Sequence, residues 1–244
     1  MKQFDIAYIS EIGDREVNED SLCCENKGGS FFLAVADGLG GSHHGDTASK
    51  SIIEYMQNCF VSRKSFLLSE SIIEANKELC LKQENTKKKA LSTVAAILLT
   101  NSKIEIANIG DSRVYLFQKN KIFYQSVDHS AAQVRVMLGE LKKEKVRESK
   151  DRNILTKVLG ESINLSVEST CFKVDEWDAI LLCSDGFWEN VFEKDMIKSL
   201  RKSKSSSSQE WIDRMMRFHK KRNKGNHDNY SCIAVIKKEL KKRV

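Results

Sequence analysis

This sequence contains no proline, no long apolar run, no Cys-x-x-Cys pair and no internal repeat. The absence of proline excludes a proline-rich linker between two domains. The longest apolar runs, such as Val94–Leu99, have six residues, whereas a transmembrane helix needs about 20. We therefore expect a single domain over residues 1–244 and no membrane partner.

The seven cysteines do not form a disulfide pattern, because their number is odd and several lie inside apolar stretches, as Cys183 does in Ile180–Cys183. Buried, reduced thiols are the better interpretation. The first residues, Met1–Asp5, lead directly into alternating sequence without the apolar core of a signal peptide. Both observations predict a cytoplasmic protein.

The charge of the chain is unevenly distributed. The net charge is +6; the first 120 residues carry 14 basic and 16 acidic residues, and the rest carry 26 and 18. The basic residues are scattered without interleaved aromatic residues, so the sequence does not predict nucleic-acid binding. A solvated face, or attraction toward phosphorylated substrates, accounts for the excess.

Hydrophobic periodicity predicts one α+β domain, because strands and helices occur in separate clusters. Strands are predicted at Phe4–Ile9, Ser30–Ala36, Ser92–Thr100, Lys103–Asn108, Arg113–Gln118, Lys121–Gln125, Leu165–Phe172, Asp178–Ser184 and Tyr230–Lys237. Helices are predicted at Asp46–Phe60, Leu68–Leu79, Glu193–Lys202 and Gln209–Arg222. The four strands between residues 92 and 125 have short connections and predict an antiparallel meander. The polar segment 128–153 predicts a small excursion that contains a helix.

Carboxylates recur where predicted strands begin or end: Asp20, Asp37, Asp111, Asp185 and Asp228. Strand ends that meet at one edge of a sheet can gather such side chains into one cluster. Clustered carboxylates stay ionised only when a positive charge lies among them. Mg²⁺ and Mn²⁺ prefer oxygen ligands, so the sequence predicts a divalent metal site.

Each motif has a simpler reading when it is taken alone. An isolated Asp-Gly pair is usually a turn. The segment Gly38–Gly41 is either a tight turn or a place where backbone approaches a ligand, and it lacks the spacing of a nucleotide-binding loop. His43 and His44 suggest a metal ligand, but adjacent histidines point in different directions, which favours a polar loop.

In combination and in order, the motifs resemble those of the type 2C, or PPM, family of metal-dependent protein phosphatases. The resemblance spans nearly the whole chain and lies in seven segments: Gly13–Ser21, Val35–Gly41, Gly45–Ser49, Asn108–Arg113, Asp128–Ser130, Leu182–Trp188 and Asp228–Ser231. It implies a four-layer αββα sandwich of two antiparallel sheets flanked by helices, with segment 128–153 as the family's flap.

The resemblance also implies the roles of individual residues. Asp37 would bridge two tightly bound Mn²⁺ or Mg²⁺ ions, and the Gly38 carbonyl, Asp185, Asp228 and Glu19 (through water) would complete their ligands. Asp111, with Asp185, would bind a third, weaker ion. Arg15 would bind the substrate phosphate, and Asp20 would orient the ligands.

Two residues depart from the commonest family pattern. Leu39 stands where many eukaryotic members have a histidine proposed as general acid, which places the chain with the bacterial-type members. Glu189 stands where an aspartate is commoner near the metals, and its longer side chain leaves its role open.

The implied reaction is the hydrolysis of phosphoserine and phosphothreonine by in-line attack of a metal-bridging hydroxide. The expected partners are phosphorylated proteins, the substrates of a cognate serine/threonine kinase, and the expected state is a monomer. Two other functions remain open: a catalytically weak phosphoprotein-binding regulator of the same fold, and another two-metal phosphoester hydrolase.

Overall fold

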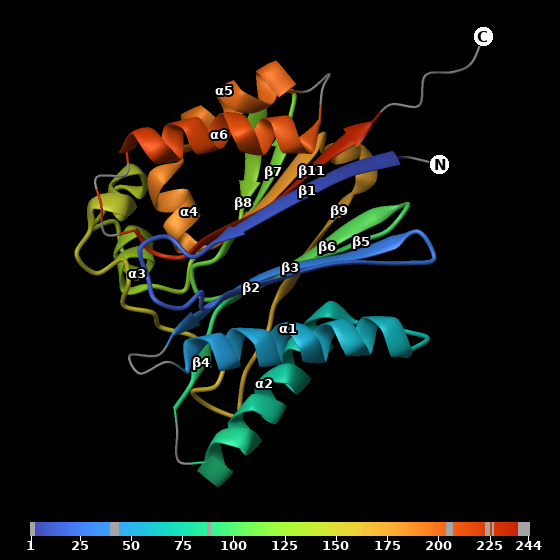
Figure 1. Ribbon diagram of the computed structural model, residues 1–244, viewed down its shortest axis with the longest axis vertical. Coiled ribbons are helices and arrows are strands. Elements are labelled where there is room, and N and C mark those ends of the chain that lie inside the picture. The colour runs from blue at the N-terminus through green and yellow to red at the C-terminus, as the bar shows by residue number, and fades with distance from the viewer. Residues whose placement is uncertain are drawn as a thin grey trace.

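Two antiparallel β-sheets pack face to face, with a pair of helices on the outer side of each, so that the layers run α, β, β, α (Figure 1). The structure is a computed structural model that describes residues 3–39, 44–86, 89–203, 207–222, 225 and 227–238. This arrangement confirms the predicted four-layer α+β fold. No helix in these ranges is both long and apolar enough to cross a membrane.

The first sheet has the strand order β1-β11-β10-β7-β8. Its strands are β1 (Gln3–Glu11), β11 (Tyr230–Lys238), β10 (Ala179–Cys183), β7 (Arg113–Gln118) and β8 (Lys121–Gln125). Helices α5 (Glu193–Ser203) and α6 (Ser208–Arg222) cover its outer face, and α4 (Asp185–Asn190) follows β10.

The second sheet has the strand order β2-β3-β5-β6-β9, and the short strand β4 pairs with β3. Its strands are β2 (Asp20–Lys27), β3 (Ser30–Leu39), β4 (Leu91–Ser92), β5 (Val94–Leu99), β6 (Lys103–Ile109) and β9 (Ser169–Lys173). Helices α1 (Gly45–Ser62) and α2 (Leu68–Thr86) cover its outer face (Figure 1).

Strands such as β3 and β10 are continuous apolar runs in the sequence, because both faces of each strand are buried. In β10, Leu181 packs against the outer helices, whereas Ile180 and Leu182 pack between the two sheets. In β3, Phe32 faces α1 and α2, and Leu33 faces the other sheet. Each such side chain contributes about 1.5–3 kcal/mol by its removal from water.

The predicted four-strand meander is wrong, because its two hairpins belong to different sheets. The strands β5 and β6 pair in the second sheet, and β7 and β8 pair in the first. Residues 110–112 cross from one sheet to the other, and Gly110 has a φ of 90° there, a conformation that glycine adopts readily. The crossing lets both hairpins bury one face between the sheets.

Segment 128–153 contains a short helix and a 3-10 helix, as the sequence predicted. They are α3 (Ala131–Met137) and η1 (Lys143–Glu148); a second 3-10 helix, η2 (Val174–Glu176), follows β9. The segment returns to the main body where Ser130 pairs with Leu155 and Ser92 pairs with Leu159. All seven cysteines are free, and two of them, Cys24 and Cys171, are exposed.

Candidate active site

The predicted acidic residues lie at the ends of strands that meet at one edge of the two sheets. Asp37 is on the face of β3 that carries Leu33 and Val35, and it therefore points between the sheets. Asp185 begins α4 just after β10, Asp111 follows β6, and Asp228 precedes β11. The predicted cluster is present.

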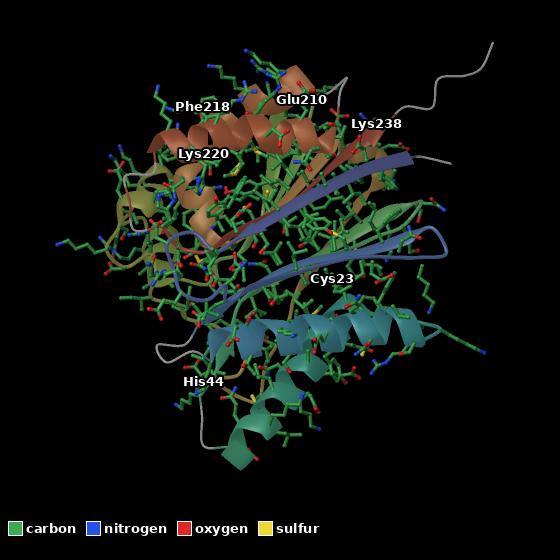
Figure 2. All side chains as sticks on the ribbon, in the orientation of Figure 1. Cys23, His44, Glu210, Phe218, Lys220 and Lys238 are labelled. Atoms are coloured by element: carbon green, nitrogen blue, oxygen red, sulfur yellow. The ribbon has the colours of Figure 1, made fainter. Side chains whose placement is uncertain are left out.

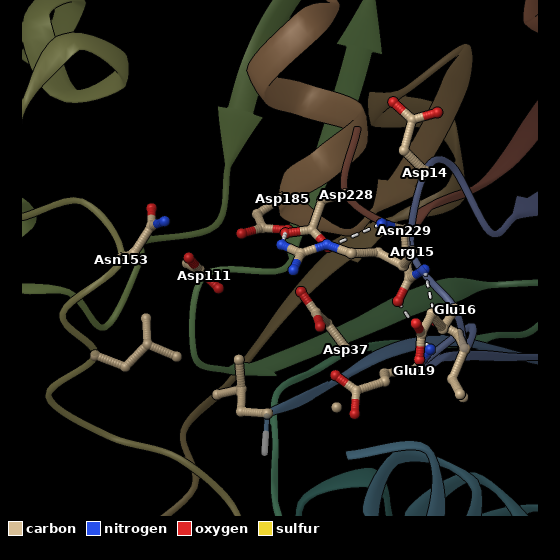
Figure 3. Close-up of a pocket in the computed structure, with 14 residues that line it drawn as sticks. Asp14, Arg15, Glu16, Glu19, Asp37, Asp111, Asn153, Asp185, Asp228 and Asn229 are labelled. Atoms are coloured by element: carbon tan, nitrogen blue, oxygen red, sulfur yellow. Dashed lines mark hydrogen bonds and ion pairs between the residues drawn. The ribbon is translucent and has the colours of Figure 1, made fainter. Parts of the chain in front are cut away.

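These side chains surround a cavity of about 610 Å³. Figure 3 shows the carboxylates of Asp37, Asp111 and Asp185 turned toward its centre, with the Arg15 guanidinium beside Asp228. The lining consists of Asp14, Arg15, Glu16, Val17, Glu19, Asp37, Gly38, Leu39, Asp111, Asn153, Leu155, Asp185, Asp228 and Asn229.

The carboxylates perturb one another strongly. The pKa of Asp37 lies well above its ordinary value, first because of burial and then because of the charge of Asp185, with which its carboxyl group shares a hydrogen bond. Burial also raises the pKa of Asp185, to about 6, and the pKa of Asp111 well above the ordinary value. The site therefore disfavours this much negative charge unless a proton or a cation enters it.

Asp20 lies directly opposite Asp37 in the β2–β3 register. Like charges in such a cross-strand pair repel. The Asp20 Oδ2 accepts a 2.7 Å hydrogen bond from the Ser184 hydroxyl, but its buried Oδ1 has no hydrogen-bond partner among the described residues. Burial raises the pKa of Asp20 to about 7. Its position opposite Asp37 is consistent with the expected role of Asp20 in orienting the metal ligands.

Arg15 supplies the positive charge at the rim of the cavity. Its Nη2 donates a 2.9 Å hydrogen bond to the Asp228 Oδ2, and both side chains are about half exposed. The contact raises the pKa of Arg15, chiefly through the hydrogen bond to Asp228. The guanidinium thus already binds an anionic group at this place.

Asn229 holds the loop that carries Arg15 and Glu19, a role that sequence reasoning missed. Its Oδ1 accepts a 2.8 Å hydrogen bond from the Glu19 amide. Its Nδ2 donates to the carbonyls of Ile12 and Val17 at 2.7 and 3.0 Å. Its position next to the predicted ligand Asp228 could have indicated a role for Asn229, but the sequence analysis assigned a role only to the aspartate.

The two glycines beside Glu19 allow a close backbone approach. A Cβ added to Gly38 would lie 2.0 Å from the Gly45 carbonyl oxygen. A Cβ added to Gly45 would lie 2.7 Å from the carboxylate of Glu19, which accepts a 3.2 Å hydrogen bond from the Gly45 amide. Both positions therefore require glycine, and the Gly38 carbonyl is held beside the carboxylates.

Glu189 lies between the acidic cluster, where its charge helps to raise the pKa of Asp185, and segment 128–153. Its Oε1 accepts a 2.5 Å hydrogen bond from the Arg152 Nε. Asn153 and Leu155, which follow Arg152, line the cavity, and sequence reasoning assigned them no role. The longer side chain of glutamate at this position thus ties the flap-like segment to α4.

Three residues of the predicted glycine-rich and histidine motifs, Gly40, Gly41 and His43, lie outside the described residues. Leu39 lines the cavity at the end of β3. His44 precedes the first residue of α1 and its side chain makes no capping hydrogen bond.

The residues present fit a bound divalent metal. No three histidine, cysteine, aspartate or glutamate side chains of the described ranges already close around one point, so ligands would rotate on binding. A cation would nevertheless relieve the repulsion between Asp37 and Asp185 and between Asp37 and the opposite residue Asp20. It would also offset the charge of the Asp20 oxygen that has no hydrogen-bond partner among the described residues. An all-oxygen set is the donor chemistry that Mg²⁺ and Mn²⁺ prefer.

The chain is similar to several known proteins. A family model described as Protein phosphatase 2C matches residues 10–238. The serine/threonine phosphatase stp of Listeria welshimeri is 30% identical over 240 residues, which cover 93% of each chain. A crystal structure of a bacterial serine phosphatase, 25% identical, gives a TM-score of 0.88 over 98% of this chain and 100% of that one. The catalytic domain of the phosphatase PstP, solved in complex with two manganese ions, is 22% identical and gives 0.82 over 98% and 100%.

The match over most of the chain decides the family. This chain belongs to the protein phosphatase 2C family, whose members are metal-dependent serine/threonine protein phosphatases.

Proposed function

We propose that this chain hydrolyses phosphoserine and phosphothreonine in proteins at the cavity built around Asp37. The observation that carries the proposal is the gathering of four of the predicted aspartates and Glu19 around one cavity that also holds Arg15. A site with only carboxylates would repel a phosphate ester, whereas one with carboxylates, bound cations and a guanidinium attracts it.

The proposed ligands for two divalent ions are Asp37, the Gly38 carbonyl, Asp185, Asp228 and, through water, Glu19. When bound, such ions supply an activated water as nucleophile and offset charge on the phosphoryl oxygens. Asp20 lies opposite Asp37 and accepts a hydrogen bond from Ser184, the residue before Asp185, and from there it would orient these two ligands.

Arg15 binds the phosphoryl group of the substrate in this proposal. Its guanidinium presents donors that match two phosphate oxygens. Its Nη2 donates a hydrogen bond to Asp228 in the structure. If Asp228 instead held a cation, the guanidinium would be free to bind the phosphate. Positioning and electrostatic stabilisation then supply most of the rate acceleration.

The test is Mn²⁺-dependent release of inorganic phosphate from a phosphothreonine peptide. We expect turnover with Mn²⁺, none with a chelator and none in the Asp37→Asn variant. Arg15→Lys should bind Mn²⁺ normally but show a raised KM, because lysine lacks the paired donors. Hydrolysis that persists in Asp37→Asn, or that fails with every phosphopeptide while Mn²⁺ binds, refutes the proposal.

We further propose a third, weaker ion at Asp111 and Asp185, with a proton-donating role because Leu39 provides no acid. Asp111→Ala should then slow hydrolysis of a phosphothreonine peptide more than that of an aryl phosphate, whose leaving group needs little protonation. Equal losses on both substrates contradict this role. The thermal midpoint of the variant shows whether it still folds.

The remaining features of the proposal concern the whole molecule. We propose a single catalytic domain over residues 1–244, a monomeric and cytoplasmic protein, and substrates that a cognate serine/threonine kinase phosphorylates. A catalytically weak regulator is not favoured, because every residue to which the resemblance gives a catalytic or metal-binding role is retained.

A further inference from the structure

A small basic cavity lies between α5 and α6, on elements that contribute nothing to the active-site cavity. Its volume is about 190 Å³. Figure 2 shows Phe218 and Lys220 on α6, in the region where nitrogen-tipped side chains extend from the outer helices. The lining residues are Lys198, Ser199, Lys202, Arg214, Arg217 and Phe218.

The acidic residues of α5 leave the positive charge of this cavity uncompensated. Asp195 binds Arg222 at 2.6 Å, and Glu193 binds Arg147 at 2.9 Å, so both carboxylates are engaged elsewhere. Of the cavity's cations, Arg214 is paired with Glu210 on its own helix.

The remaining three cations, Lys198, Lys202 and Arg217, form no ion pair with any described residue. They stand one helical turn apart on α5 and on the facing side of α6. The cavity therefore attracts an anion.

Ser199 adds an unused hydrogen-bond donor to the cavity wall. Its side chain is 2% exposed, and its Oγ has no hydrogen-bond partner among the described residues. A serine within a helix usually donates to the carbonyl four residues earlier, and here it does not. Buried hydroxyl groups are normally satisfied. An oxygen of a bound ligand would accept this hydrogen bond once the Ser199 side chain rotates toward the cavity, because its Oγ is buried in the structure.

We propose that this cavity, the α5–α6 cavity, binds a phosphoryl group, namely a second phosphorylated side chain of a protein substrate. The inference rests on the proposed function, because it is the phosphatase reaction that brings phosphoproteins to the chain. A phosphate monoester carries close to two negative charges and three acceptor oxygens, which match two ammonium groups, a guanidinium and a hydroxyl. A water-sized atom takes about 30 Å³, so the cavity volume of about 190 Å³ is large enough for a phosphoryl group.

Nucleic acid and membrane fit this surface less well. The Phe218 ring is flanked by Lys198 Nζ at 5.7 Å and Arg222 Cζ at 5.8 Å from its centroid, so it offers no open face for base stacking. None of the large exposed apolar side chains of the described residues lies on α5 or α6. Nothing here would insert into lipid.

The experiment has a binding arm and a kinetic arm. Inorganic phosphate is titrated into the full chain with Mn²⁺ while the backbone amide resonances are recorded. KM is then measured for phosphothreonine peptides with and without a second phosphoserine, joined by flexible linkers of several lengths. The variants are Lys198→Glu/Lys202→Glu and Ser199→Ala, and the matched control is Lys220→Glu/Lys221→Glu, which makes the same charge change outside the cavity.

We expect phosphate to shift the Ser199 amide, and the second phosphate to lower KM by roughly tenfold at one or more linker lengths, as one charge-assisted hydrogen bond would. Both effects should vanish in Lys198→Glu/Lys202→Glu, weaken in Ser199→Ala and persist in the control. Turnover of p-nitrophenyl phosphate should be unchanged in all three.

An unshifted Ser199 amide overturns the proposal. A shifted amide without any KM advantage also overturns it, because the cavity then takes only free phosphate. A chain that hydrolyses no phosphopeptide refutes the proposed function instead, and the binding arm still decides whether the cavity holds phosphate.

Discussion

Replacing Arg113 by methionine should destabilise the protein severely, because it leaves a buried carboxylate without its partner. The Arg113 and Asp128 side chains are 3% and 2% exposed. Their two hydrogen bonds measure 2.8 and 2.6 Å, and Arg113 also donates to the Tyr115 hydroxyl at 3.0 Å. The guanidinium carbon lies 3.5 Å from the centre of the Trp188 ring.

Removing one partner of such a pair costs about 3–5 kcal/mol. For a chain of this size, one kcal/mol corresponds to roughly 2–4 °C in Tm. We therefore expect Arg113→Met to lower Tm by roughly 6–20 °C. Trp188 Nε1 donates a 3.0 Å hydrogen bond to the Asp111 carbonyl, so looser packing of Trp188 should also weaken binding of the third ion that we propose at Asp111.

The assay is urea unfolding followed by tryptophan fluorescence in the presence of a chelator, which separates the free energy of unfolding from metal binding. The double variant Arg113→Met/Asp128→Leu is the control, because it removes both charges and should recover much of the loss. An Arg113→Met variant within about 1 kcal/mol of wild type refutes the reasoning.

Three further predictions follow from other contacts. Gly38→Ala, whose Cβ would lie 2.0 Å from the Gly45 carbonyl oxygen, should lower kcat/KM for a phosphopeptide by at least about tenfold, and a variant within twofold of wild type contradicts the close approach. Burial lowers the pKa of His219 to about 4, below the ordinary 6.5. The neutral form is favoured on folding, so His219 should contribute about 3 kcal/mol of stability that is present above pH 6.5 and is lost as pH falls below 4. His219→Gln should lose correspondingly less over that range in urea titrations, and equal losses would rule out this linkage. Mn²⁺ at 100 times its Kd should add about 2.7 kcal/mol, seen as a rise in Tm that chelator reverses and that Asp37→Asn largely abolishes; an unchanged Tm would count against the metal site.

The strands and helices with strong periodicity could be predicted closely. Arg113–Gln118 and Lys121–Gln125 were predicted with the bounds that the structure shows for β7 and β8. β2 was missed because it is an edge strand of half-exposed and charged residues, without a continuous apolar face. α4 was missed because six residues are too few to show a helical period. The predicted strand Leu165–Phe172 begins only at Ser169.

The acidic cluster could be predicted because strand ends are visible in a sequence as turn signals beside apolar runs. The contacts that hold the cluster could not. Asn229 binds the Glu19 amide across 210 residues, and Glu189 binds Arg152 across 37. Such partners depend on where the sheets place distant loops, and no local pattern records that placement. The prediction that the two hairpins form one meander failed for the same reason.

The position of β11 has a consequence for the order in which the enzyme matures. In the first sheet β1 has one strand neighbour, β11, and β11 also separates β1 from β10. A ribosome releases the N-terminal strand long before the C-terminal one, so β1 leaves the tunnel with no partner to receive it. Arg15 and Glu19, which follow β1, reach their places only when Asn229 arrives. We therefore expect a nascent chain to be inactive until β11 emerges, and a chain cut before residue 229 to lack phosphatase activity.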